Sequence, residues 1–232
     1  ALRHALPLPM GRVSAARWSI NSDGFLATAA PKKEAAVGAP SSRRTNQSAL
    51  AFMATVVCGT LNNSSFGVIS GAAQDLARQL NFENQAPALT TAITLSCFGS
   101  TLAGARFLLR FRYYERVIVV LVMSTAAYLG VALSTLPGMP GARWLLVACA
   151  CTAGVAQVFG EVTILAFLKG LSPGLVGAWG AGTGLAGILG SLVYICMREL
   201  AGMSSAAVFL SGAPLAVPYW LAFRYLHAQA AR

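Results

Sequence analysis

The sequence predicts an all-α membrane protein folded as a bundle of six transmembrane helices. Its composition is 56% hydrophobic and only 10% charged, whereas a soluble domain has about 25% charged residues. The mean hydropathy is +0.64. Long charge-free stretches are separated by short polar connections, and a hydrocarbon core about 30 Å thick needs roughly 20 apolar residues per helix. These stretches lack the alternating pattern of a membrane β-barrel.

The charge-free stretches divide the chain into a tail and one membrane domain. Six spans are expected near 49–73, 86–105, 117–136, 144–168, 175–197 and 203–225, within a domain of residues 48–226 and before a short end at 227–232. Residues 1–47 hold seven of the 17 Lys and Arg but only two acids. This composition indicates a basic, disordered tail, and a remnant of an organelle transit peptide is the alternative.

The distribution of basic residues predicts the orientation of the spans. With the N-terminus cytoplasmic, 14 Lys and Arg lie on the cytoplasmic side and three, Arg78, Arg143 and Arg198, on the opposite side. Cytoplasmic loops of membrane proteins carry an excess of Lys and Arg. Both ends of the chain are therefore expected in the cytoplasm.

Four consecutive polar residues, Asn62-Asn63-Ser64-Ser65, fall in the middle of the first span. Successive side chains step about 100° around a helix, so all four cannot face one neighbour. We expect Asn62, Asn63 and Ser65 to line a cavity, or the helix to be broken there, as in transporters that bind substrate at discontinuous helices. The alternative is that the side chains hydrogen-bond between helices and hold the packing.

Glu161 is the only formal charge well inside a predicted span, and Gln157 precedes it by one turn. A carboxylate in hydrocarbon costs on the order of 3 kcal/mol or more, which favours a proton relay or a ligand for a polar solute. An ion pair with Lys169, two turns later, is the alternative. Asp75 ends the first span on the non-cytoplasmic side, either as a substrate-facing or gating acid or as a solvated charge.

The segment Gly182-Thr183-Gly184-Leu-Ala-Gly187 matches the G-x-G-x-x-G spacing of a dinucleotide-binding loop. That reading requires a preceding strand and an acid about 20 residues later, and neither is present. The glycines instead predict a closely packed transmembrane helix, with Thr183 facing a partner helix or the cavity. One face of this helix carries Gly180, Gly184, Gly187 and Ser191, and a second row of small residues carries Gly182, Ala186 and Gly190.

No catalytic or metal-binding pattern is evident in the sequence. The two histidines are His4 and His227, outside the spans, and the five cysteines lie in apolar runs without paired spacing. A Ser-His-acid or Cys-His set cannot be assembled within the spans. We therefore expect a protein that is not an enzyme, with no cofactor, no metal and no nucleic-acid partner.

Three blocks of the sequence resemble the battenin family of lysosomal and vacuolar membrane proteins. They are "LNNSSFGVISGAAQDL" (61–76), "GEVTIL" (160–165) and "WGAGTGLAGILGSLVY" (179–194), and the resemblance extends over residues 50–226. Two departures are Gln74, where the family usually has His, and Leu185, where it has Gly.

The resemblance implies a transporter-like fold of the major-facilitator type, of which this chain matches the amino-terminal half. It implies a multi-pass protein of the lysosomal or vacuolar membrane that moves a small polar solute, with protons, and supports pH and metabolite homeostasis. Its partners would be the lipid bilayer and a missing C-terminal half or a second copy. A non-transporting scaffold and another organelle membrane are the alternatives.

Overall fold

The computed structural model describes the backbone of residues 19–20, 26–27, 42–108 and 110–231, and side chains from residue 48 onward except at 103, 105–109 and 232. The chain divides into two units, Ala1–Ser42 and Arg43–Arg232. In the first unit, β1 (Ser19–Ile20) pairs antiparallel with β2 (Leu26–Ala27). The rest of the expected tail up to residue 41 lies outside the described residues, and the first helix begins at Ser42, inside the range assigned to the tail.

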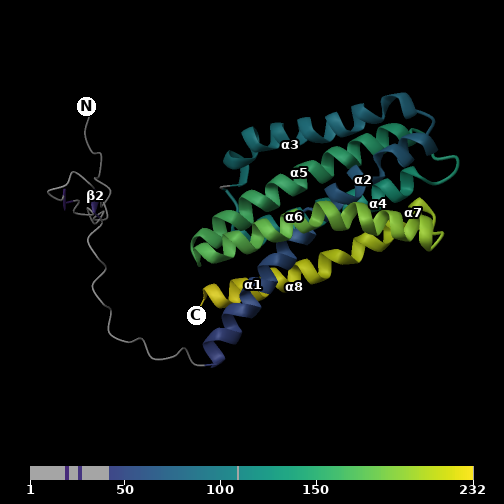
Figure 1. Ribbon diagram of the computed structural model, residues 1–232. Coiled ribbons are helices and arrows are strands. Elements are labelled where there is room, and N and C mark those ends of the chain that lie inside the picture. The colour runs from purple at the N-terminus through teal and green to yellow at the C-terminus, as the bar shows by residue number, and fades with distance from the viewer. Residues whose placement is uncertain (1–18, 21–25, 28–41, 109, 232) are drawn as a thin grey trace, which may run out of the picture. The chain divides into compact units, whose positions relative to one another are not determined.

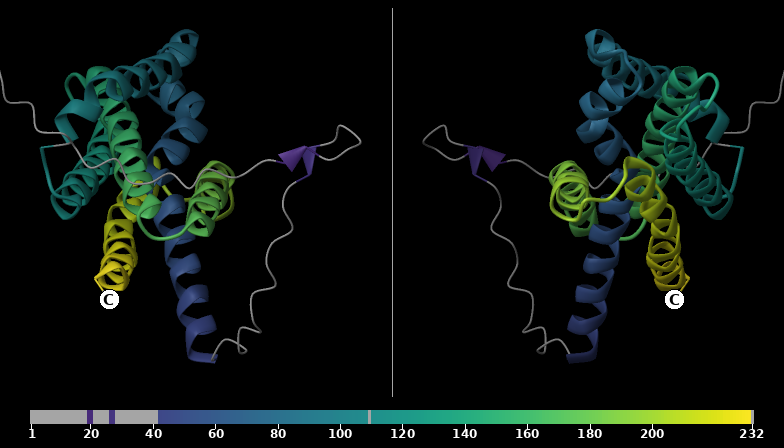
Figure 2. Two further views of the ribbon diagram at one scale, coloured as in Figure 1. Left: turned by 90° about the vertical axis from the view of Figure 1, so that its left-hand side faces the viewer. Right: turned by 90° about the vertical axis from the view of Figure 1, so that its right-hand side faces the viewer.

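The second unit is entirely helical where it is described (Figures 1 and 2). Its elements are α1 (Ser42–Asn62), α2 (Ser64–Gln79), η1 (Glu83–Gln85), α3 (Ala86–Leu108), α4 (Tyr113–Ser134), α5 (Ala142–Lys169), α6 (Pro173–Ile195), the π-helix η2 (Cys196–Leu200), α7 (Ser205–Gly212), η3 (Ala213–Leu215) and α8 (Ala216–Ala230). Helix α5 packs against both α3 and α4, α2 packs against α6, and α4 packs against α7.

The helices confirm an all-α membrane protein. Within the described part of the chain, five segments are long and apolar enough to cross a bilayer: Ser48–Gln79, Tyr113–Ser134, Ala142–Lys169, Pro173–Leu200 and Ser205–Ala230. They coincide with five of the six predicted spans. The remaining span, 86–105, coincides with α3, a helix of 23 residues that is not among the five. The last helix continues to Ala230, beyond the predicted end of the span.

The first span is kinked at Asn63, which separates α1 from α2. Asn63 Nδ2 donates to the Gly59 carbonyl at 2.9 Å, and Ser64 Oγ donates to the Leu61 carbonyl at 2.8 Å. Side chains that bond to carbonyls three or four residues earlier compete with the helical ladder and bend helices. The local break expected from four consecutive polar residues is therefore present.

Glycines bring both halves of the kinked span into backbone contact with α6. A Cβ added at Gly59 would lie 2.6 Å from the Trp179 carbonyl oxygen, and one at Gly67 would lie 2.8 Å from that of Ala186. From the other side, a Cβ at Gly190 would lie 2.7 Å from the Gly67 carbonyl carbon. Van der Waals packing of this kind holds membrane helices together, because lipid removes the hydrophobic drive between them.

The α6 face that makes this contact differs from the predicted one. A Cβ at Gly180, Gly184 or Gly187 would meet no atom within 4 Å among the described residues, so these glycines do not pack helices within this part of the chain. The second row packs instead, because Gly182, Ala186 and Gly190 are the buried small residues of α6. Ser191 is the one residue of the predicted face that lies against α2 among the described residues, where it meets Gly71.

We predict that, in this chain by itself, Gly182→Leu destabilises the bundle and Gly184→Leu, one half-turn away, does not. A side chain at Gly182 would overlap the Val56 carbonyl, whereas Gly184 faces open space. Inserting extra side-chain atoms into a well-packed interior typically lowers the free energy of unfolding by about 1–3 kcal/mol. Thermal unfolding in detergent, followed by size-exclusion chromatography, measures the difference. Equal unfolding temperatures for the two variants would contradict the assigned packing face.

Candidate functional site: the kinked first span

Asn62 is completely buried at the end of α1 and connects three helices. Its Nδ2 donates to the Gln157 carbonyl of α5 at 2.9 Å, and its Oδ1 accepts from the Tyr219 hydroxyl of α8 at 3.0 Å. Gly160 leaves space for this amide, because a Cβ at that position would overlap Asn62 Oδ1. The amide is therefore held from both ends in a site shaped around it.

Asn63, at the kink, is 4% exposed and joins the first span to α6. Its Nδ2 lies 3.3 Å from Thr183 Oγ1 in addition to its bond to Gly59, and its Oδ1 has no partner among the described residues. Thr60 Oγ1 also donates to the Gly182 carbonyl at 3.1 Å. Thr183 thus faces a partner helix, which is one of its two expected positions.

Further buried hydroxyl groups surround this layer. Ser65 and Thr163 are both 0% exposed, and neither hydroxyl oxygen has a hydrogen-bond partner in the described part of the chain. Leaving a buried polar group unsatisfied costs about 1–3 kcal/mol, so these oxygens are positioned to accept or donate bonds that the described residues do not supply.

Asn62, Asn63 and Ser65 do not line an open cavity in this conformation. All three are 4% exposed or less, and the void of about 10 Å³ beside Ser64 and Tyr219 has room for about one water molecule. Their contacts correspond to the alternative expectation, hydrogen bonding between helices. Tyr219 is a further residue of this site that the sequence does not single out. Its hydroxyl inside an apolar run is the available signal, since a buried tyrosine usually finds a polar partner.

Glu161 is half-buried on α5, one turn beyond the residue whose carbonyl binds Asn62. The two ion pairs between described residues are Arg78–Glu83 and Arg198–Asp75, so the alternative pairing with Lys169 is absent. The Gln157 side chain on the preceding turn lies near α3, where its Oε1 is 3.9 Å from Cys97 Sγ. Glu161 is thus a carboxylate within a span that no described cation neutralises.

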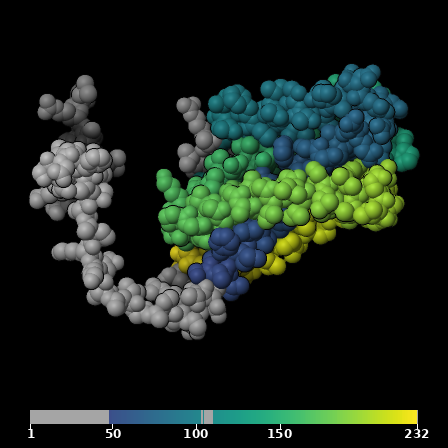
Figure 3. Space-filling view, in the orientation of Figure 1, coloured from purple at the N-terminus to yellow at the C-terminus, as the bar shows by residue number. Residues whose placement is uncertain are grey.

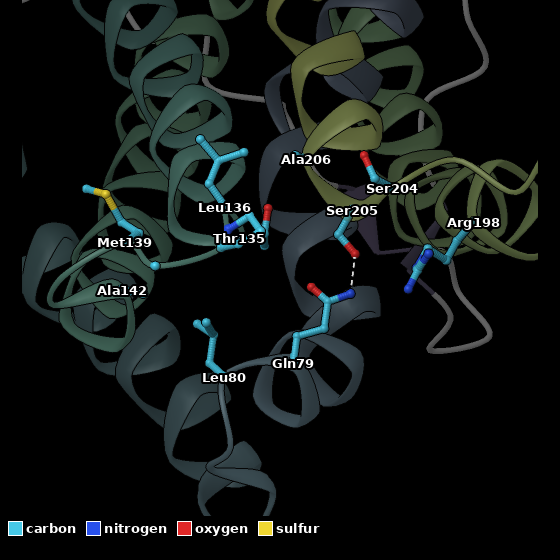
Figure 4. A pocket seen from close by; sticks show the side chains of 12 residues that line it. Gln79, Leu80, Thr135, Leu136, Met139, Ala142, Arg198, Ser204, Ser205 and Ala206 are labelled. Atoms are coloured by element: carbon cyan, nitrogen blue, oxygen red, sulfur yellow. Dashed lines mark hydrogen bonds between the residues drawn. The ribbon is translucent and has the colours of Figure 1, made fainter.

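Asp75, at the other end of α2, belongs to a separate polar cluster. Its Oδ2 accepts from the Tyr194 hydroxyl at 2.5 Å and from Arg198 Nε at 3.3 Å, and Arg198 lies in the π-helix η2. Gln79 Nε2 donates to Ser205 Oγ at 2.6 Å across a cavity of about 540 Å³ (Figure 4). Asp75 therefore joins α2 to the α6–α7 connection.

Two further expectations concern cofactors. The G-x-G-x-x-G segment lies inside the continuous helix α6, so its glycines do not form a phosphate-binding loop between a strand and a helix. In the part of the chain that the structure describes, no group of three or more His, Cys, Asp or Glu side chains could hold a metal ion.

The fold and this polar layer define a multi-pass α-helical membrane protein with a kinked first span. A model of the CLN3 protein family matches residues 53–232. The chain therefore belongs to the CLN3 protein family, which is the battenin family.

Individual relatives agree with this assignment. The chain is 28% identical to Battenin of Dictyostelium discoideum over 165 residues, which are 71% of this chain and 38% of that protein. It is 30% identical to Protein BTN1 of Chaetomium globosum over 166 residues, 70% of this chain and 35% of that protein. The chain thus spans little more than a third of the length of these relatives. Comparison with solved structures gives no significant match.

We predict that Gly160→Ala destabilises the protein through Asn62. The added methyl group would overlap the amide oxygen, at a cost of about 1–3 kcal/mol. Combining it with Asn62→Ala should recover part of that loss, because neighbouring substitutions that share one space are not additive.

The free energy of unfolding of both single variants and the double variant measures this coupling. Gly180→Ala, at a helical glycine with open space around it, is the matched control and should be neutral or slightly stabilising. Strict additivity of Gly160→Ala and Asn62→Ala would contradict the contact.

Proposed function

We propose that this protein forms one half of a transport pathway for a small polar solute, with Glu161 facing the pathway. The observation that supports this most strongly is the carboxylate of Glu161 inside α5, which forms no ion pair with any described residue and lies next to the turn that binds Asn62. Intramembrane ionisable groups usually face a bundle interior or a water-filled cavity and mark ion or substrate pathways. The kink at Asn63 adds the discontinuous helix that transporters place near the bilayer midplane.

The buried side-chain amides of Asn62 and Asn63 hold the helices in place. Glu161 is therefore the group that remains available to a solute or a proton. Asn62 is fully hydrogen-bonded, so solute binding there would first have to displace Tyr219 or the Gln157 carbonyl. Glu161 needs no such displacement. We therefore assign Asn62, Asn63 and Thr183 to the framework of the pathway, and Glu161 with Gln157 to its surface.

The second half of the pathway would cover the open face of α6. This helix lies on the face of the helical unit that Figure 3 shows. Within the segment Pro173–Leu200, only 22% of an apolar stretch of 18 residues is buried. Gly180, Gly184 and Gly187 lie on its uncovered side, where a neighbouring helix could approach closely. The occupant would be the remaining length that the relatives possess, or a second copy of this chain.

Membership of the battenin family supports a place for the protein in the lysosomal or vacuolar membrane, with a role in luminal pH and metabolite homeostasis. The excess of Lys and Arg on the side of the N-terminus supports a cytoplasmic N-terminus. A polar solute moved together with protons would connect the carboxylate of Glu161 to luminal acidity.

We predict that Glu161→Gln removes most of the flux driven by a pH gradient. The amide keeps the shape of the side chain but can neither bind a proton nor neutralise a cation. The full-length protein in reconstituted vesicles, assayed with a panel of polar metabolites with and without a pH gradient, measures the effect. A fall of about tenfold or more is expected, which corresponds to roughly 1.4 kcal/mol.

Glu199→Gln is the matched control, because Glu199 is an exposed carboxylate in η2, and it should leave flux unchanged. If Glu161→Gln retained both flux and its pH dependence, Glu161 would have a structural role only. If the unmodified protein moved no metabolite of the panel, a non-transporting membrane scaffold would be the better description.

A further inference from the structure

Two cavities meet at the start of α5, away from the kinked span. One, of about 390 Å³, lies between the first turns of α3 and α5 and is lined mostly by apolar side chains: Phe82, Ala88, Leu89, Ala92 and Val147. The other, of about 360 Å³, lies at the helix ends and includes Gln79, Asn81 and Gly141. Arg143 and Trp144 line both. We call the two neighbouring cavities together the cleft; its inner part between the helices is mostly apolar, and its outer part at the helix ends is polar.

Arg143 lines both cavities, and its guanidinium is held by two hydrogen bonds while its other N–H groups remain available. Its Nε donates to the Leu80 carbonyl at 2.8 Å and its Nη2 to the Asn81 carbonyl at 3.1 Å. A guanidinium has five N–H groups in a rigid fork, so these two bonds orient it and leave the others available. No acid lines either cavity, and the nearby Glu83 carboxylate pairs with Arg78 at 3.6 Å. The cleft is therefore positively charged.

Trp144 indicates the depth of this cleft in the bilayer. Its side chain is 78% exposed in the first turn of α5. Tryptophan concentrates at membrane–water interfaces, where its ring lies among lipid headgroups. The polar cavity at the helix ends thus lies at headgroup level, and the apolar cavity between α3 and α5 lies at the level of the acyl chains.

We propose that this cleft binds an anionic phospholipid of the leaflet that contains the α5 N-terminus. The phosphate would contact Arg143, the rest of the headgroup would occupy the outer cavity, and one acyl chain would lie between α3 and α5. Arginine binds phosphate through two parallel N–H groups. Each cavity is within the size range of ligand pockets.

The charge of the cleft selects among lipids. A zwitterionic choline lipid offers the same phosphate but carries a quaternary amine that cancels its net charge and is repelled by a neighbouring guanidinium. No carboxylate lines either cavity to offset that repulsion, and Arg143 lines both. An anionic lipid such as phosphatidylglycerol presents no such cation, so it should be preferred over phosphatidylcholine with the same acyl chains.

Native mass spectrometry of the detergent-purified protein tests this with those two lipids. Phosphatidylglycerol should be retained about fivefold more than phosphatidylcholine, as expected for one basic contact near a membrane surface. Ala88→Phe, which places a ring in the lining of the apolar cavity and leaves Arg143 in the sequence, should lower phosphatidylglycerol retention by a similar factor. Ala126→Phe, at an exposed alanine of α4 outside the cleft, is the matched control and should change nothing.

Equal retention of the two lipids, or equal loss in both phenylalanine variants, would overturn the proposal. Crosslinking of unmodified protein provides a second readout that does not depend on a variant folding. Phosphatidylglycerol with a photoreactive acyl chain should label residues 82–92 and 143–147 about fivefold more than the exposed face of α4. Uniform labelling around the bundle would show that no such site exists.

Discussion

The buried amide of Asn62 is the constraint on which the packing of the bundle depends. The buried apolar residues form two clusters, one built mainly on α2, α4 and α5, the other on α4, α5 and α8, and Asn62 is completely buried in the same helical unit. An amide in such a place must be hydrogen-bonded at both ends. Its partners come from α5 and α8, so the relative depth and rotation of three helices are set by one side chain. The absence of a Cβ at Gly160 follows from the same requirement.

The kink at Asn63 follows from a second requirement, contact with α6 along the full length of the first span. Gly59 and Gly67, on opposite sides of the kink, both meet the α6 backbone. A straight helix that touched α6 at one of these points would diverge from it further along, as packed helices cross at an angle. Bending at the polar residues keeps both contacts, and the side chains of Asn63 and Ser64 satisfy carbonyls that the bend frees.

Features set by the local sequence could be predicted, and features set by distant partners could not. Charge-free runs gave most of the spans because hydrocarbon thickness fixes their length, and consecutive polar residues indicated the break at Asn63. Which small-residue face of α6 packs within the described chain could not be predicted, because Gly184 and Gly182 are equally small and lie on different faces of one helix. Gly182 is the residue that packs because α1 and α2 lie on its side of α6. Likewise, the Asn62–Tyr219 bond joins residues 157 positions apart, which no local pattern encodes.

Polar groups that find hydrogen-bond partners within the described chain hold the helices in place, whereas groups that lack such partners are the candidates for function. Asn62 and Asp75 each have two partners, and groups of this kind fix the geometry of the helices. Glu161 has no neutralising cation among the described residues, and Arg143 retains donors after bonding to two carbonyls. In a bilayer such incomplete groups are costly unless something outside the described chain completes them. The proposals made above supply such partners: a solute or a proton for Glu161 in α5, and a lipid for Arg143, beside an exposed tryptophan.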